Sequence, residues 1–146
     1  MNKGLTTVLH EVIWLMDRKA SEIVQREYGI SLSWFRLLII LKNVGPVTQH
    51  RLAQSLNHSD ASVSKLLDRM SDSGFVTVTV DPAHRRRRIV GLTPAGRKLA
   101  TQIDTALEDL FSKDLTAAGI DIPRFTTFVS ALSDQLHKGP STDDNS

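Results

Sequence analysis

The chain has no cysteine among its 146 residues. This absence excludes disulfide bonds, thiolate metal sites and the sensing of oxidants through a thiol. Long hydrophobic runs are missing as well, since stretches such as Leu37 to Leu41 fall far short of the roughly 20 residues that span a bilayer. The N-terminus lacks the apolar core and cleavage site of a secretory signal. We therefore expect a cytoplasmic protein that does not contact the membrane.

Signals of catalysis are also scarce. No glycine-rich loop follows a predicted strand, and no serine or threonine lies in a local nucleophile motif. The histidines have no paired spacing typical of a metal site; they are His10, His50, His58, His84 and His137. We predict no enzyme activity, no metal and no cofactor.

Positive charge is present and is concentrated in the middle of the chain. Residues 47–98 contain nine basic and four acidic residues, a net charge of +5. The rest contains nine basic and twelve acidic residues, a net charge of −3. A basic middle between acidic ends indicates that one region meets a polyanion. The alternative for the four arginines at 85–88 is an ordinary solvated run of charge.

Hydrophobic periodicity predicts long helices at both ends of the chain. Apolar residues recur about every 3.6 positions from Leu5 to Val24, and Gly29 is placed to cap that helix. A second helix, apolar on all sides, begins at Ser31 or Ser33 and ends before Gly45-Pro46. After the helix start Thr93-Pro94, two further apolar stripes predict two more helices, 99–115 and 125–136.

The middle of the chain predicts two short helices and a β-hairpin. Thr48 is placed to cap a third helix, Asn57-His58 forms a turn, and Ser59 or Asp60 caps a fourth helix. Residues 75–80 alternate as a strand, residues 81–82 open a hairpin, and residues 89–92 form the return strand. The four arginines then lie at the hairpin tip. A short helix beside a cationic hairpin is the arrangement of a winged helix-turn-helix.

The order of these elements resembles the multiple-antibiotic-resistance regulator (MarR) family from about Leu5 to Leu136. The residues from Asp81-Pro82 to Leu92-Thr93-Pro94-Ala95-Gly96 match the family's wing pattern, D-P-x-D-R-R followed by L-T-x-x-G. The helix V-S-K-L-L-D-R-M with the following Gly74-Phe75-Val76 resembles the family's recognition helix and its exit. Two departures are His84, which replaces an acidic residue that would pair with Arg86, and Val78, where the family commonly has a basic residue.

The resemblance implies the fold class and the domain boundaries. We expect one domain over residues 1–138, mainly α with a small antiparallel β wing, and a flexible tail at 139–146. A winged helix-turn-helix lobe at about 31–93 would be flanked by N- and C-terminal dimerisation helices at about 5–28 and 94–138. The expected dimer contacts, for which packing within one chain is the alternative, are Val8, Val12, Phe125, Phe128, Val129 and Leu132.

The expected partner is double-stranded DNA. The helix at 59–73 would enter the major groove, where Lys65 offers a donor to guanine and Ala61 can lie against a thymine methyl group. Ser59 is equally suited to capping the helix and to holding a phosphate. The wing at 81–88 would lie at the minor groove. The full set of predicted DNA-binding residues is Ser59, Ala61, Ser62, Ser64, Lys65, Arg69, Arg85, Arg86, Arg87 and Arg88.

The four wing arginines are expected to have different roles. Because side chains alternate along a strand, Arg85 and Arg87 should point away from Arg86 and Arg88. We expect Arg86 in the minor groove and its neighbours on phosphates. Asp81 is a hypothetical internal anchor in place of the missing acidic partner.

The family resemblance implies a homodimeric repressor of a pseudo-palindromic operator, released by a small aromatic or phenolic effector. Candidate effector-lining residues are His10, Trp14, Arg18 and Trp34, although a tryptophan on an apolar helix is more often part of the core. An effector would favour a dimer geometry whose recognition helices mismatch the groove. The rival function is a winged helix that binds another protein, which would not require four arginines.

Overall fold

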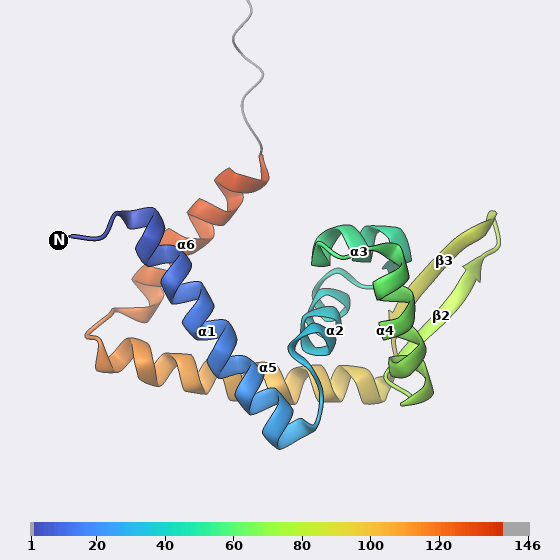
Figure 1. The fold of residues 1–146 in the computed structure, drawn as a ribbon, viewed down its shortest axis with the longest axis horizontal. Coiled ribbons are helices and arrows are strands. Elements are labelled where there is room, and N and C mark those ends of the chain that lie inside the picture. Colours follow the sequence, from blue (N-terminus) through green and yellow to red (C-terminus); the bar gives the residue numbers. More distant parts are fainter. Residues whose placement is uncertain (1, 139–146) are drawn as a thin grey trace, which may run out of the picture. The chain divides into compact units, whose positions relative to one another are not determined.

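The computed structural model describes residues 2–138 (Figure 1). The helices are α1 (Leu5–Tyr28), α2 (Leu32–Val44), α3 (Gln49–Leu56), α4 (Asp60–Asp72), α5 (Pro94–Ala117) and α6 (Ile122–His137). The strands are β1 (Val47–Thr48), β2 (Val76–Asp81) and β3 (His84–Leu92). The predicted fold class, mainly α with a small antiparallel β wing, is confirmed.

The chain divides into two compact units, and the boundary between them falls inside α5. Residues 1–107 form the first unit, which contains every element from α1 to β3 and the beginning of α5. Residues 108–146 form the second unit, where the described elements are the end of α5 and α6. The predicted tail at 139–146 lies outside the described residues.

Local capping signals in the sequence predict most helix starts correctly. The side-chain oxygen of Ser31 accepts a hydrogen bond from the backbone N–H of Trp34 at 3.3 Å, so Ser31 rather than Ser33 caps α2. Thr48 caps α3, and Ser59 rather than Asp60 caps α4. Such a cap satisfies a backbone donor that the first helical turn leaves free.

One face of α4 is buried in the core of the first unit. The buried residues of this core are Ala20, Val24, Ile30, Leu37, Leu38, Leu41, Leu52, Ala53, Val63, Leu66, Leu67, Met70, Val76, Val90, Ala100, Ile103 and Leu107. Four of them, at positions 63, 66, 67 and 70, follow the spacing of one helix face. Their burial fixes the rotation of α4 and leaves its polar face towards solvent.

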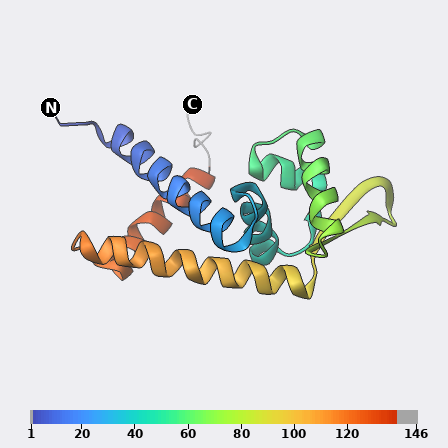
Figure 2. The same cartoon turned by 60° about the horizontal axis from the view of Figure 1, so that its bottom comes forward.

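The sheet contains a strand that the sequence did not predict. The strand order is β1-β3-β2, and both neighbouring pairs are antiparallel. In the short β1, Val47 lies opposite Val90 and Thr48 lies opposite Ile89. Because α3 begins at the next residue, this pairing ties the start of the helix-turn-helix to the wing (Figure 2).

The wing arginines do not lie at the hairpin tip, and that prediction was wrong. The tip is the turn Pro82-Ala83, and all four arginines belong to β3, which begins at His84 and not at Ile89. Val80 lies opposite Arg88, whereas the next residue, Asp81, lies opposite His84. Residues 85–87 therefore form a three-residue bulge, since β2 offers no position between these two pairs.

Candidate nucleic-acid interface

The solvent face of α4 presents the predicted major-groove residues. Ala61, Ser62, Lys65 and Arg69 are exposed, and Ser64 is partly buried. Lys65 is the cation nearest the middle of this face, so it is the residue best placed to meet base edges when α4 lies in a major groove.

The start of α4 is a capped helix end that remains open to solvent. Ser59 Oγ accepts a hydrogen bond from the backbone N–H of Ser62 at 3.1 Å and donates one to Ser62 Oγ at 2.9 Å. The capping role predicted for Ser59 is therefore confirmed. Both hydroxyls are exposed, so they remain available for a phosphate contact.

The wing carries four exposed arginines, and none forms an ion pair within residues 2–138. Asp81 does not anchor one of them, because its Oδ1 accepts a hydrogen bond from the backbone N–H of Ala83 at 2.9 Å and closes the hairpin turn. The hypothesis that Asp81 replaces the missing acidic partner was therefore wrong. Like charges placed side by side repel one another, so such a cluster favours an anionic partner.

A groove of about 560 Å³ runs between the wing, the start of α3 and the start of α4. Its lining residues are Thr48, Gln49, His50, Arg51, Asp60, Arg86, Arg87 and Arg88. Arg86, Arg87 and Arg88 all line this groove. The predicted alternation of the arginine side chains requires two strands that stay in register, and the bulge at residues 85–87 interrupts that register.

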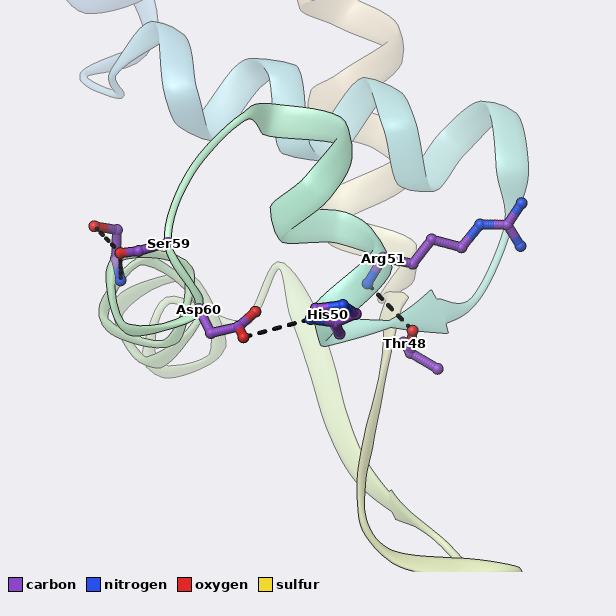
Figure 3. Close-up of polar contacts among 6 residues, drawn as sticks. Thr48, His50, Arg51, Ser59 and Asp60 are labelled. Atoms are coloured by element: carbon purple, nitrogen blue, oxygen red, sulfur yellow. Dashed lines mark hydrogen bonds and ion pairs between the residues drawn. The ribbon is translucent and has the colours of Figure 1, made fainter.

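One polar contact crosses between the two helices of the helix-turn-helix. Nδ1 of His50, in the first turn of α3, lies 3.4 Å from Oδ2 of Asp60, the first residue of α4 (Figure 3). Both side chains are well exposed, at 70% and 62%. The neighbouring Arg51 side chain extends away from this pair (Figure 3). This pairing was not foreseen from the sequence, because the two residues are ten positions apart on different helices.

The base of the wing is fixed by the residues of the L-T-x-x-G motif. The backbone N–H of Thr93 donates to the carbonyl of Phe75 at 3.1 Å, and its hydroxyl donates to the carbonyl of Gly74 at 2.6 Å. Gly74 has a φ of +81°, a conformation that favours glycine. A Cβ at Gly96 would overlap the carbonyl oxygen of Phe75. These contacts hold the end of α4, the wing and the start of α5 in one arrangement.

Comparison with known proteins agrees with this geometry. A model described as the MarR family matches residues 28–87, from the end of α1 through the first arginines of the wing. This match covers the helix-turn-helix and the start of the wing, so that part of the chain is similar to the MarR family.

Two curated relatives of this chain come from Bacillus subtilis strain 168, and both are named uncharacterized HTH-type transcriptional regulators. YwoH is 24% identical over 107 residues, which cover 73% of this chain and 77% of YwoH. YcgE is 32% identical over 85 residues, which cover 58% of this chain and 50% of YcgE. The second match therefore spans only half of its relative.

Solved structures extend the likeness to nearly the whole chain. A cysteine-to-serine mutant of MarR from E. coli is 21% identical, has a TM-score of 0.79, and the match covers 93% of this chain and 98% of that one. The same mutant complexed with operator DNA is 22% identical, with a TM-score of 0.71 and coverages of 90% and 93%. The S. aureus MepR-DNA complex is 19% identical, with a TM-score of 0.70 and coverages of 94% and 99%. At these identities the likeness establishes the fold.

The predicted effector residues are only partly brought together. On α1, the guanidinium of Arg18 lies 5.7 Å from the ring centre of Trp14. Trp34, on α2, is partly exposed and packs edge-on against Phe75 with ring centres 6.2 Å apart. His10 is exposed on α1.

Two further observations bear on the partners of this chain. Within residues 2–138 no cluster of three or more His, Cys, Asp or Glu side chains is arranged to hold a metal ion. Over the same range, no helix combines the length and the apolar character that crossing a membrane requires.

Proposed function

We propose that this regulator is a homodimeric repressor of a pseudo-palindromic operator, with α4 in the major groove and the wing at the minor groove. The observation that carries the proposal is the shared exposure of the α4 polar face and of four wing arginines without an ion pair within residues 2–138. Helix α4 packs directly against β2, so both surfaces belong to one compact unit (Figure 1). Together they form the DNA face, comprising Ser59, Ala61, Ser62, Ser64, Lys65, Arg69 and residues 85–88.

Within the DNA face, the contacts divide into base recognition and backbone attachment. Lys65 reads guanine acceptors, because it is the cation on the middle of the α4 face. Ser59, Ser62 and Arg69 hold phosphates around it, and residues 85–88 bind the backbone and the minor groove of the adjoining segment. Most of the affinity then comes from charge, and most of the sequence preference comes from α4.

Lys65→Ala is expected to relax sequence preference more than it weakens binding. Losing a direct base contact costs about 1–3 kcal/mol of discrimination at one base pair and leaves binding to random duplex nearly unchanged. The measurement is selection of duplexes from a random pool by the wild type and by the variant. Each protein is then titrated against the selected duplexes to measure its affinity. Asp72→Ala, at the far end of the same face, is the control and should keep the selected sequence. A variant with unchanged base preference at every position would remove Lys65 from the DNA face.

The dimer is proposed to form through the apolar residues of α1 and α6. Val8, Val12, Phe125, Phe128, Val129 and Leu132 are 38% to 60% exposed in the single chain. Within the described part of the second unit, α6 has no buried residue, although five of its large apolar side chains follow one helix face. Apolar surface of this extent favours association with a second copy.

Phe128→Glu is expected to convert the dimer to a monomer at about 10 µM, since a buried charge without a partner costs several kcal/mol. Size-exclusion chromatography with light scattering gives the mass directly. Ser130→Glu, on the opposite side of α6, adds the same charge and should leave the dimer intact. A wild-type chain that is monomeric at this concentration would contradict the proposed dimer.

The proposed effector is a small aromatic or phenolic molecule that releases the dimer from DNA. The support is the Trp14–Arg18 pair, because an exposed indole with a guanidinium beside it offers stacking and charge to such a molecule. His10 lies on the same helix one turn earlier. Binding would shift the population towards a dimer geometry in which the two α4 helices no longer match successive major grooves.

A further inference from the structure

The groove between α3 and the wing contains one imidazole among its described lining residues, that of His50. Imidazole is the group that gains or loses a proton between about pH 5 and pH 8. His50 lines the groove together with Arg86, Arg87 and Arg88 of β3. The helices add two further charged residues to the lining of the groove, Asp60 of α4 and Arg51 of α3. The Arg51 side chain extends away from His50 and Asp60 (Figure 3). The groove therefore presents several cations and a single carboxylate within the described residues.

Asp60 is an unfavourable charge in a surface that meets DNA. It is the first residue of α4, next to the Ser59–Ser62 cap, and its side chain is 62% exposed. A carboxylate there repels phosphates, and only His50 lies within ion-pair distance of it among the described residues. A protonated His50 would neutralise this carboxylate and add a donor to the groove, whereas a neutral His50 leaves the repulsion in place.

We propose that His50 is a further DNA-contacting residue, which binds a phosphodiester as the imidazolium and so couples operator binding to the uptake of a proton. The inference rests on the proposed DNA face, because the groove shares Arg86, Arg87 and Arg88 with it. The coupling is reciprocal: DNA favours the proton on His50, and the proton favours DNA. Affinity is therefore high where His50 is protonated and falls as the pH rises.

The test is a titration of a labelled random-sequence duplex of about three helical turns at fixed ionic strength, between pH 6 and pH 8. The wild type is expected to bind about tenfold more tightly at pH 6, below the limit of tenfold per pH unit for one proton. His50→Gln should reduce this ratio to less than about twofold, while His58→Gln and His84→Gln should retain it. Asp60→Asn should raise the affinity at pH 8 and also reduce the ratio. His50→Gln with the full wild-type ratio, or a wild type without pH dependence, would overturn the inference.

Two further arms separate the causes of a negative result. Arg86→Ala in the same titration should weaken binding at every pH, and if it does so while His50→Gln keeps the ratio, only the inference fails. If Arg86→Ala is also without effect, the DNA face itself is wrong and the inference falls with it. The affinity for the duplex should be the same whether sodium phosphate or sodium chloride is used to set the ionic strength at a given pH. If the affinity for the duplex falls only in phosphate, the groove binds a free anion, and the assignment of His50 to the duplex would be overturned.

Discussion

Replacing all four wing arginines with glutamine is expected to weaken binding to duplex DNA about a thousandfold at roughly 0.1 M salt. Each arginine that neutralises a phosphate releases a counterion, so the slope of log K against log[salt] should become flatter by about three per bound subunit. Arg86→Ala alone should cost at least about tenfold. The unfolding temperature should not fall, because these side chains are exposed and none forms an ion pair within the described chain.

Two controls assign the effect to charge at the wing. Changing all four arginines to lysine preserves the charge and should preserve most of the salt slope, while losing the part of the affinity that depends on guanidinium geometry. Arg97→Gln with Lys98→Gln removes two exposed charges from α5, outside the DNA face, and should change affinity only slightly. An unaltered salt slope in the glutamine variant would mean that the wing does not touch DNA, which would favour the rival function of binding another protein.

Features set by neighbouring residues were predictable from the sequence. A hydroxyl followed by a helical pattern predicted the caps of α2, α3 and α4, and Thr93-Pro94 predicted the start of α5, because capping depends on residues within one helical turn. The buried stripe of α4 was predictable for the same reason, since a period of 3.6 is a local property.

Features that depend on pairing between distant segments were not predictable. β1 is two residues long and has no pattern of its own; it becomes a strand because residues 47–48 meet residues 89–90. The wing bulge arises because the pairing register at the tip of the hairpin differs by three residues from the register at its base. The Asp81 turn closes the tip on His84, while the base of the hairpin pairs Val76 with Leu92. The excess falls on residues 85–87, which places three arginines in one groove where simple alternation would have separated them.

Gly96→Ala is expected to destabilise the folded chain by about 3 kcal/mol or more, and to lower the unfolding temperature by about 10 °C. The added Cβ would overlap the carbonyl oxygen of Phe75 and would lie 3.2 Å from Cδ2 of Leu92. A flexible side chain could move aside, but this carbonyl is backbone and already accepts the hydrogen bond from Thr93. The clash therefore has to separate α5 from the end of α4. Thermal unfolding followed by circular dichroism measures the shift.

Gly91→Ala is the matched control, because it adds the same methyl group five residues away. There the Cβ would meet Thr77 Oγ1 at 3.4 Å and Pro46 Cγ at 3.9 Å, which is ordinary contact, so a change within about 1 kcal/mol is expected. A Gly96→Ala variant as stable as the control would mean that α5 does not start against Phe75. The wing would then lack its fixed base, and the common orientation of α4 and β3, on which the DNA face depends, would lose its support.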